Sequence, residues 1–462
     1  FRYTADEAQK GGITAEDGLK ISKTLADTGQ LDFLNVVRGR IHTDPAMTDL
    51  IPIQGMKNAP HLDFAGQVKK LTGMPTFHAA KIPDVATARH AVEAGLLDMV
   101  GMTRAHMADP HVVKKIIEGR EDDIRPCVGA TYCLDRIYEA GDALCIHNAA
   151  TGRELTMPHT IPPAEKKRKV VIVGAGPAGL EAARVAAERG HHVVVFEAQP
   201  DPGGQVRLTA QSPRRREMIS IIDWRMAQCA ARDVEFHFNT WAEADDVINQ
   251  NPDVVIIATG GMPNTELLES GKDTPHVTTS WDIIAGDVKP AQSILIYDES
   301  GDHAALQAAE VAANAGAKIE IMTPDRTFSA GVMAMNLVPY MRSLQDKDTT
   351  FTVARRLLGV ELRGNKLEAQ IGTDYSDHSD IHEYDQVVVN YGTLPLDELY
   401  FDLKNLSSNG GAVDHDALVN GHPQNIVKNS GGEFQLFRIG DAVSARNTHA
   451  AIYDALRLLK DI

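Results

Sequence analysis

The stretch Lys169–Glu197, KVVIVGAGPAGLEAARVAAERGHHVVVFE, decides the fold of this chain. It consists of an apolar strand, a glycine turn, a helix and a second strand that ends in an acid. Gly174, Gly176 and Gly179 permit, in that order, the tight turn, the approach of the backbone to a pyrophosphate and the close packing of helix on strand. The N–H groups that open the helix favour phosphate, and Glu197 is placed to accept hydrogen bonds from a ribose. The stretch therefore predicts a dinucleotide site.

Composition narrows the class of protein. The chain has 462 residues, 43% of them hydrophobic, which is enough for several domains with their own cores. Its formal net charge of −17 argues against nucleic acid and anionic membranes as partners. There is neither an apolar run of about 18 residues nor a secretory signal, so we expect no membrane span. Three of the four cysteines, Cys127, Cys133 and Cys145, form a ligand-like cluster rather than a disulfide framework, which favours the cytoplasm.

Residues 1–125 alternate apolar runs with helical patterns. The expected strands are Phe1–Tyr3, Asp32–Val37, Pro75–Ala80 and Asp98–Met102. The expected helices are Ala15–Thr28, His61–Leu71, Val85–Ala94 and Pro110–Glu118. These β/α units predict a parallel sheet. Because eight units close a barrel and open edges are a liability, we interpret the region as the C-terminal half of a (β/α)8 barrel whose first half precedes Phe1. The alternative is a small open sheet.

The remainder divides into a cysteine segment and linker at 126–168, a nucleotide domain formed by 169–285 plus 395–462, and a second unit at 286–394. The second unit repeats the first as a strand at Ser293–Ile296, a helix at Ala304–Ala315 and a strand at Lys318–Met322. Together these patterns predict a pair of Rossmann-type domains.

The second unit has lost its glycines. Alignment of the two helices places Ser300, Asp302 and Ala305 at the glycine positions. A carboxylate at the second position repels phosphate oxygens and fills their space, so we predict that this unit does not bind NAD(P)H. The alternative is that Gly301 restores a shifted loop.

These pieces resemble the iron–sulfur flavoproteins that include trimethylamine dehydrogenase, histamine dehydrogenase and 2,4-dienoyl-CoA reductase. The resemblance covers essentially the whole chain and rests on the glycine unit and on RPCVGATYC…LCIHNAATGRE at 125–154, IIATGG at 256–261 and IGDA at 439–442. It implies an FMN barrel, an iron–sulfur segment and a module similar to glutathione reductase. By overall similarity, the nearest look-alikes are the N-methylproline and dimethylglycine demethylases.

The family holds one [4Fe–4S] cluster on C-x-x-C-x2/3-C-x11/12-C. Cys127, Cys133 and Cys145 match the first, third and fourth positions, and Ala130 occupies the second. The resemblance therefore implies either a [3Fe–4S] cluster or a [4Fe–4S] cluster whose fourth ligand is His147, Asp135 or water. A lost cluster is the alternative, and the spacing is poor for zinc.

The resemblance also implies flavin sites. Arg2, at a strand end, corresponds to an arginine that faces the isoalloxazine. The FMN phosphate corresponds to Ala80, Lys81, Met102, Thr103 and Arg104, with surface arginines as the alternative for Arg2 and Arg104. The second nucleotide is FAD or ADP, and the intact motifs favour FAD. Its site corresponds to Gly174, Gly176, Gly179, Glu197, Gly204, Gln205, Ala258, Thr259, Gly260, Gly440 and Asp441.

The loop after the second strand offers His42 or Asp44 to deprotonate or orient an amine, and Arg38 or Arg40 to pair with a substrate carboxylate. Each is otherwise an ordinary polar loop residue. We expect an enzyme that oxidatively N-demethylates a small methylated amine or amino acid and passes electrons to an electron-transfer flavoprotein. The alternatives are an NAD(P)H-dependent enoate or 2,4-dienoyl-CoA reductase and a non-catalytic electron-relay subunit. Because barrels of this family commonly pair, we expect a homo-oligomer.

Overall fold

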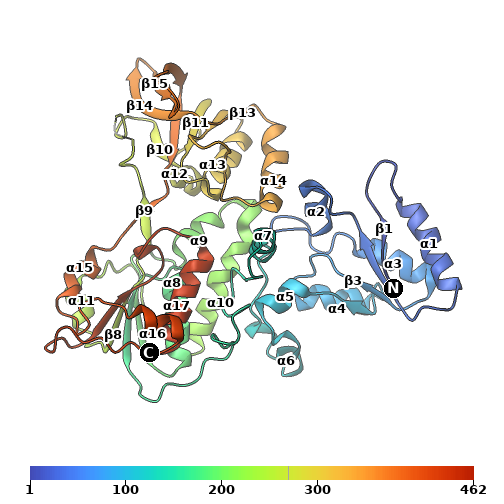
Figure 1. Cartoon of the computed structure of the whole chain (residues 1–462), viewed down its shortest axis with the longest axis horizontal. Coiled ribbons are helices and arrows are strands. Elements are labelled where there is room, and N and C mark those ends of the chain that lie inside the picture. Colours follow the sequence, from blue (N-terminus) through green and yellow to red (C-terminus); the bar gives the residue numbers. More distant parts are fainter. Residues whose placement is uncertain (269) are drawn as a thin grey trace. The chain divides into compact units, whose positions relative to one another are not determined.

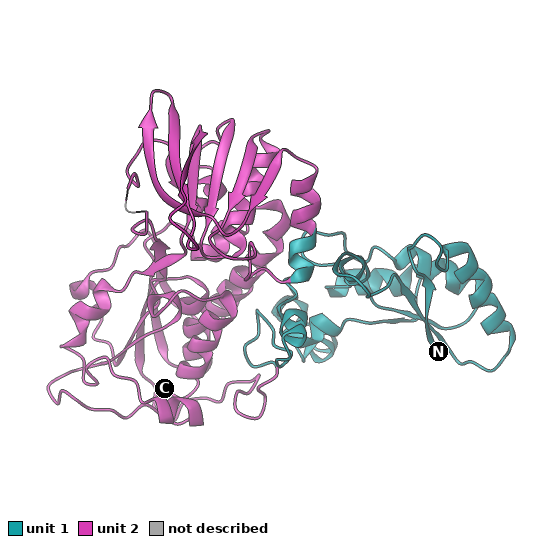
Figure 2. Cartoon of the chain, turned by 45° about the horizontal axis from the view of Figure 1, so that its top comes forward, with its two compact units in different colours: residues 1–151, 334–338 teal, residues 152–333, 339–462 magenta. Residues whose placement is uncertain are grey.

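The computed structural model describes residues 1–268 and 270–462. The chain divides into two compact units, which Figure 2 shows in different colours. Unit 1 consists of Phe1–Thr151 and Ala334–Val338, and unit 2 of Gly152–Met333 and Pro339–Ile462. Among the described residues, no helix combines the length and the apolar character that a membrane crossing requires.

Unit 1 is built on a parallel sheet with the strand order β1-β2-β3-β4. Its strands are β1 (Arg2–Asp6), β2 (Leu34–Arg38), β3 (Thr76–His78) and β4 (Met99–Val100). Helices α1 (Ala15–Asp27), α3 (Leu62–Thr72) and α4 (Val85–Glu93) connect successive strands. Thr14 closes a capping box on α1 and the Asp84 side chain caps α4, which explains where these helices begin. The predicted α/β pattern with a parallel sheet is confirmed here.

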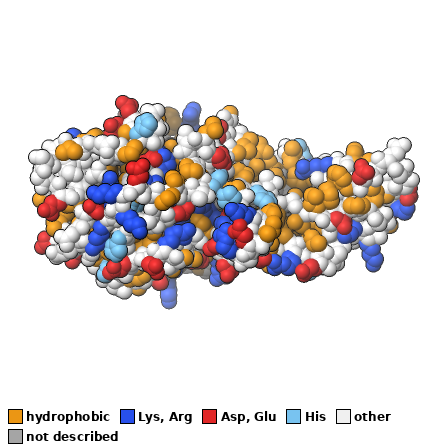
Figure 3. All heavy atoms as spheres, turned by 90° about the horizontal axis from the view of Figure 1, so that it is seen from below, with side chains coloured by type: hydrophobic (Ala, Val, Ile, Leu, Met, Phe, Trp, Pro, Cys, Tyr) orange, Lys and Arg blue, Asp and Glu red, His pale blue; other side chains and the backbone are white. Residues whose placement is uncertain are grey.

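The core of unit 1 lies between the sheet and these helices. Leu34 and Val36 from β2 pack with Val68 from α3 and Ala91 from α4, all of them buried. Other apolar side chains remain at the surface, and Figure 3 shows hydrophobic side chains over this unit, on the right of the view. The exposed ones include Phe1, Phe33, Ile41, Met99, Val113 and Ile117.

Four further helices follow the strand ends of unit 1. They are α2 (Asp44–Leu50), α5 (Thr103–Ala108), α6 (Val112–Ile117) and α7 (Tyr132–Tyr138). Helix α2 begins at Asp44, the last residue of the loop that we expected after the second strand, and was not predicted. Thr43 caps it by accepting a hydrogen bond from the Ala46 N–H, and a proline stands in its first turn.

Unit 2 contains a parallel sheet with the order β19-β8-β5-β6-β7. Its strands are β5 (Lys169–Val173), β6 (His192–Phe196), β7 (Glu235–His237), β8 (Val254–Ile257) and β19 (Gln435–Arg438). The predicted glycine unit forms β5, α8 (Pro177–Glu188) and β6. In Figure 1, α8 lies beside α10 (Ser220–Ala230) and α17 (Thr448–Leu459), and both pack against it. Residues Val170–Val173 of β5 are all buried, so both faces of the strand are covered, which explains its uninterrupted apolar sequence.

A second parallel sheet in unit 2 has the order β10-β17-β11-β12-β13. Its strands are β10 (Val277–Thr279), β11 (Ser293–Asp298), β12 (Lys318–Met322), β13 (Thr349–Thr352) and β17 (Gln386–Asn390). Helices α12 (Ser280–Ala285), α13 (His303–Asn314) and α14 (Ala334–Gln345) accompany it. The predicted strand–helix–strand repeat is present as β11, α13 and β12.

An antiparallel sheet packs on this second parallel sheet and was not predicted. It consists of β14 (Arg356–Arg363), β15 (Lys366–Gly372) and β16 (Asp380–Tyr384). Leu357, Leu367 and Ile371 from this sheet share one buried cluster with Leu295 and Val387. Two short strands, β9 (Gly261–Pro263) and β18 (Thr393–Pro395), pair with each other.

Candidate functional site

The glycine turn between β5 and α8 has the form of a phosphate cradle. Gly174 is left-handed, with φ of 103°, and a Cβ there would lie 2.3 Å from the Ala258 carbonyl oxygen. A Cβ at Gly179 would lie 1.8 Å from the Gly174 carbonyl oxygen, so only glycine allows α8 to approach so closely. A Cβ at Gly176, the residue that caps α8, would meet nothing within 4 Å. The helix start is thus open at the position where a pyrophosphate binds in such turns.

Glu197 follows β6 directly and is anchored beside this turn. Its Oε2 accepts a hydrogen bond from the Ala175 N–H at 2.7 Å, and its Oε1 accepts one from the Gln199 N–H at 2.9 Å. A carboxylate oxygen has two acceptor sites, so these bonds orient the group and leave capacity for ribose hydroxyls. The Glu197 side chain is therefore in position for its predicted role.

Two glycine-containing segments far apart in sequence meet at the same turn. The Gly203 N–H donates to the Ala175 carbonyl at 2.9 Å. A Cβ at Gly440 would lie 2.9 Å from the Cβ of Ala178, so this residue packs against the start of α8. The Gln205 side chain donates to Asp441 Oδ2 at 3.0 Å. Gly204–Gln205 and Gly440–Asp441 thus converge at the cradle, as predicted.

Asp441 and the segment after β8 complete the cradle. Burial raises the pKa of Asp441, against hydrogen bonds from Arg446 and Gln205 that lower it. A buried carboxyl of this kind suits a hydrogen bond to a sugar or phosphate group. The Ala258 N–H donates to the Val173 carbonyl at 2.8 Å, and Thr259 Oγ1 donates to the Leu396 carbonyl. These bonds hold Ala258–Gly260 against the glycine turn.

The second nucleotide unit has a carboxylate in its cradle. Asp302 caps α13, the position that Gly176 holds on α8, and its Oδ1 accepts from the Ala304 N–H at 2.8 Å. Ser300 Oγ donates to Asp302 Oδ2 at 2.9 Å. Gly301 has φ of 68°, so the left-handed turn required by the shifted-loop alternative is present. The Asp302 carboxylate nevertheless stands at the helix N-terminus, where it opposes a phosphate.

Asp298, the last residue of β11, lies directly beneath this loop. Its Oδ1 accepts hydrogen bonds from the Gly301 N–H at 3.0 Å and from the Asn390 side chain at 2.9 Å. Its Oδ2 has no hydrogen-bond partner among the described residues. Burial, together with the negative charge of Asp302, raises the pKa of Asp298 to about 7. The loop therefore contains a carboxyl group that stays largely protonated below neutral pH.

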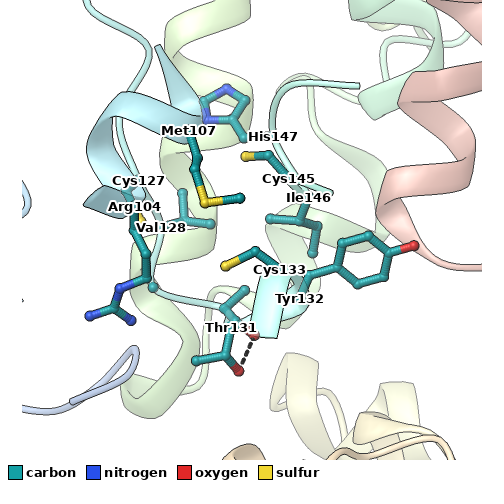
Figure 4. A pocket seen from close by; sticks show the side chains of 12 residues that line it. Arg104, Met107, Cys127, Val128, Thr131, Tyr132, Cys133, Cys145, Ile146 and His147 are labelled. Atoms are coloured by element: carbon teal, nitrogen blue, oxygen red, sulfur yellow. Dashed lines mark hydrogen bonds between the residues drawn. The ribbon is translucent and has the colours of Figure 1, made fainter. Parts of the chain in front are cut away.

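Three thiols line one pocket of unit 1, shown in Figure 4. The pocket lies between α5, α7 and the chain around His147. Its lining residues are Arg104, Met107, Cys127, Val128, Gly129, Ala130, Thr131, Tyr132, Cys133, Cys145, Ile146 and His147. Burial and the neighbouring Cys127 and Cys145 raise the pKa of Cys133 to about 11, so metal binding would have to displace its proton.

The arrangement of the thiols distinguishes between kinds of metal. Among the described residues, no three or more His, Cys, Asp or Glu side chains are grouped to hold a metal ion. Zinc ligands all meet at a single ion. A cubane cluster presents a different iron to each thiolate, so its ligands stand further apart. Three soft thiols around one pocket are a donor set that fits such a cluster.

Lys81 and Arg104, two of the residues predicted to bind the FMN phosphate, hold the same loop. Lys81 is 6% exposed, and its Nζ donates to the Met56 carbonyl. Arg104 Nη2 donates to the Pro52 carbonyl at 2.8 Å. Ala80 is buried at the end of β3, and Met102 and Thr103 form the start of α5. Two cations thus lie after the carboxyl ends of β3 and β4, and (β/α)8 barrels bind phosphate at the corresponding end of their sheet.

The structure does not bring Arg2, His42 and Asp44 into this arrangement. The strand expected at Phe1–Tyr3 extends to Asp6, so Arg2 begins β1 instead of following it. Arg2 is exposed at the amino end of the strand, whereas the phosphate loops follow carboxyl ends. His42 and Asp44 are also exposed, and Asp44 is the first residue of α2.

Comparison with known proteins places the chain in a family. Residues 168–452 match the model of the pyridine nucleotide-disulphide oxidoreductases. The chain is 68% identical over its whole length to a probable N-methylproline demethylase from Rhizobium meliloti and 41% identical to an N,N-dimethylglycine/sarcosine dehydrogenase from Chromohalobacter salexigens. It covers 68% of each of these relatives. The chain belongs to the pyridine nucleotide-disulphide oxidoreductase family.

A solved structure supports the same assignment. The 2-naphthoyl-CoA reductase, in complex with 2-naphthoyl-CoA, superimposes with a TM-score of 0.84 at 26% identity. The match covers all of this chain and 64% of the reductase chain. The resemblance to the iron–sulfur flavoproteins, and by overall similarity to their N-methylproline and dimethylglycine demethylases, is confirmed by the two relatives named above.

In this member of the oxidoreductase family, the carboxyl ends of the strands of unit 1 hold side chains that sequence reasoning missed. Asp6 ends β1 and accepts a bond from Arg38 Nε, at the end of β2, at 2.8 Å. His78 ends β3, is 2% exposed, and its Nδ1 lies 2.8 Å from the Val36 carbonyl oxygen. His61 lies edge-on to it, with 6.3 Å between ring centroids.

Burial lowers the pKa of both His61 and His78, so both rings are neutral at physiological pH. Neutral imidazoles can accept or donate a proton. The signal that could have found Asp6 and His78 is their position as the last residues of parallel strands, where ligands bind in α/β proteins.

Proposed function

We propose that this chain forms the larger part of a flavin- and iron–sulfur-dependent oxidoreductase that oxidatively N-demethylates a small methylated amine or amino acid. The observation that carries the proposal is the combination of a three-thiol pocket with one open nucleotide cradle and one obstructed cradle. The 68% identity to a probable N-methylproline demethylase supports the substrate class.

The residues present fit three redox groups. The cradle around Gly176 and Glu197 suits FAD better than ADP alone, because Gln205 and Asp441 extend it beyond the adenosine half. The pocket of Cys127, Cys133 and Cys145 suits an iron–sulfur cluster. Lys81 and Arg104 offer charge to an FMN phosphate. When bound, FMN would accept a hydride and the cluster would transfer single electrons.

The proposed reaction oxidises the C–N bond of an N-methyl group. A hydride leaves the methyl carbon, water adds to the resulting iminium carbon, and the demethylated amine and formaldehyde separate. The Asp6–Arg38 pair, whose carboxylate is buried, and the neutral His61 and His78 are better placed than the exposed His42 and Asp44 to orient the amine. An electron-transfer flavoprotein would receive the electrons, since Asp302 opposes the binding of a reduced nicotinamide nucleotide.

Unit 1 is proposed to be half of a flavin-binding (β/α)8 barrel. Its strands β1 and β4 are the two edges of the sheet, and several apolar side chains of this unit are exposed. An edge of this kind is ordinarily covered by further chain. We also propose that the domain boundaries lie at residues 125, 168, 285 and 394. The protein is proposed to form a homo-oligomer.

The second candidate function is an NAD(P)H-dependent reductase of unsaturated acyl-CoA. The fold-wide similarity to 2-naphthoyl-CoA reductase favours it. Its electrons would enter through a nicotinamide nucleotide, and the carboxylate of Asp302 stands against that route.

One experiment separates these functions. The full-length protein is incubated anaerobically with N-methylproline or dimethylglycine and an artificial electron acceptor, and formaldehyde is measured. We expect formaldehyde equal to acceptor reduced, and no oxidation of NADPH in the presence of an unsaturated acyl-CoA. NADPH oxidation without formaldehyde production would reverse the assignment. Denaturing extraction identifies FMN, FAD or ADP in the same preparation.

A further inference from the structure

The thiol pocket has one wall that lacks a ligand. Between Cys127 and Cys133 the wall is formed by Val128, Gly129, Ala130 and Thr131, and all four line the pocket. None of them carries a thiol, an imidazole or a carboxylate. Ala130 is 8% exposed, so its methyl group is buried within the pocket wall. A cubane bound by the three thiols would turn its remaining iron toward this wall, because each thiolate serves a different iron.

Asp135 is engaged elsewhere and does not line the pocket. Thr131 Oγ1 and the Asn336 side chain each lie 3.4 Å from Asp135 Oδ2 and donate to it. The carboxyl group thus faces Asn336, which removes it from the set of fourth ligands.

The backbone at Ala130 is fixed in place. Asn336 is 3% exposed, and its amide donates to the Ala130 carbonyl at 3.0 Å and to Thr131 Oγ1 at 2.7 Å. The Gln54 side chain donates to Asn336 Oδ1 at 3.3 Å. Thr131 itself is left-handed, with φ of 58°. A wall held in this way does not rearrange easily to bring another protein ligand to the iron.

His147 and Met107 also line the pocket but come from other sides. The His147 ring is oriented by the contact of its Nδ1 with the Pro126 carbonyl oxygen at 2.9 Å. In Figure 4 this ring lies beyond Cys145, whereas the Met107 sulfur points between the thiols. A thioether is a weak ligand for iron in an all-thiolate cluster.

We propose that the cluster carries one iron without a protein thiolate, at the Ala130 wall, and that this iron is exchangeable and accepts a small ligand such as hydroxide or a low-molecular-weight thiol. The inference rests on the proposed function, because it requires the cluster. It concerns only the iron at this wall and predicts reversible interconversion of [4Fe–4S] and [3Fe–4S] forms.

The test uses the full-length holoprotein and four variants. One-electron oxidation with ferricyanide should convert [4Fe–4S]²⁺ to [3Fe–4S]⁺ with release of Fe²⁺ and give the electron paramagnetic resonance spectrum of a [3Fe–4S] cluster, and Fe²⁺ together with one electron from dithionite should restore the original form. Ala130→Cys should supply the missing thiolate and abolish this conversion. Serine has nearly the same shape as cysteine but no thiol, so Ala130→Ser should retain the conversion. Cys229→Ala, at a thiol outside the pocket, should behave as the native protein.

A second readout uses 2-mercaptoethanol. The added thiol should shift the spectrum of the native protein and of Ala130→Ser, and should leave Ala130→Cys unchanged. Met107→Leu should still respond, because the thioether is not a ligand in this proposal. A native protein that does not respond to the thiol, together with a Met107→Leu variant that does, would assign the fourth position to that sulfur and overturn the inference.

The outcomes separate the inference from the function on which it rests. An iron-containing protein that resists conversion, or an Ala130→Cys variant that converts as readily as the native protein, would overturn the inference alone. A protein without iron and sulfide would overturn the cluster as well, while the formaldehyde assay would still report on demethylation.

Discussion

The side-chain amide of Asn390 donates a hydrogen bond to Asp302 Oδ1 at 3.2 Å and so fixes a carboxylate at the N-terminus of α13. The equivalent position on α8 is Gly176, where space is open. The same βαβ framework therefore presents phosphate with a cradle in one copy and a negative charge in the other.

The carboxylate of Asp302 predicts that the second nucleotide unit has a low affinity for nicotinamide nucleotides. Isothermal titration of the holoprotein with NADH or NADPH should show no micromolar binding, because Asp302 repels the phosphates. Asp302→Gly should increase the affinity, and Asp287→Asn, at an exposed acid, should not change it. Micromolar binding to the native protein would show that the turn at Gly301 is sufficient for a cradle.

Asp298 predicts a pH dependence of stability. Its pKa is raised from the ordinary value near 4 to about 7 in the folded protein. The stability that the protonated Asp298 adds to the folded state is therefore fully present below about pH 4 and is lost as the pH rises through about 7. Asp298→Asn keeps a neutral group there and should make the melting temperature of unit 2 less sensitive to pH over this interval. Scanning calorimetry at a series of pH values measures this melting temperature. The control variant Asp377→Asn, at an exposed acid, should keep the pH dependence of the native protein.

Glu197 should determine nucleotide content. Glu197→Ala removes the carboxylate that accepts from Ala175 and Gln199 and that faces the ribose. A hydrogen bond to a charged group contributes about 1.5–3 kcal/mol, so the FAD or ADP affinity should fall roughly 10- to 100-fold. Denaturing extraction and chromatography give the content. Unchanged content in Glu197→Ala would remove this residue from the site, and the exposed Glu235→Ala controls for surface charge.

The buried charges behind the glycine turn should dominate the stability of unit 2. Glu181, 1% exposed, pairs with Arg184 at 2.7 Å and with Arg225 at 2.8 Å. Glu181→Ala removes the carboxylate that Arg184 and Arg225 share and leaves Arg184 paired with Glu188, which should cost about 3–5 kcal/mol of unfolding free energy. Glu188→Ala, whose carboxylate is partly exposed, should cost less. Equal melting temperatures for the two variants would contradict this interpretation.

The sequence specified the nucleotide unit well because its determinants are local. Gly174, Gly176 and Gly179 lie in one turn, and the repeat strand Lys318–Met322 is found at its predicted bounds. Gly204 and Gly440 could be assigned only by resemblance, because their contact with the turn spans the domain. Helix α2 was missed because it is short and its cap, Thr43, lies in a loop of mixed polar residues.

The thiol pocket could be predicted only in part. The spacing of Cys127, Cys133 and Cys145 indicated a shared site, and they do line one pocket. The role of Asn336 could not be inferred, since it lies in a helix of the second nucleotide unit, far along the chain from Ala130. The role of Arg2 stays a prediction, because an apolar run does not show which end of its strand faces a ligand.

The short segment Ala334–Val338 makes the two units inseparable as genetic modules. The chain leaves unit 1 after Thr151, returns to it for these few residues and leaves again. A truncated protein that begins at Gly152 would still carry Met335 and Asn336, which are 1% and 3% exposed in the complete chain, without Met47, Ile53 and Gln54 to cover them. Neither unit can therefore be exchanged between relatives as an independent cassette without carrying part of the other.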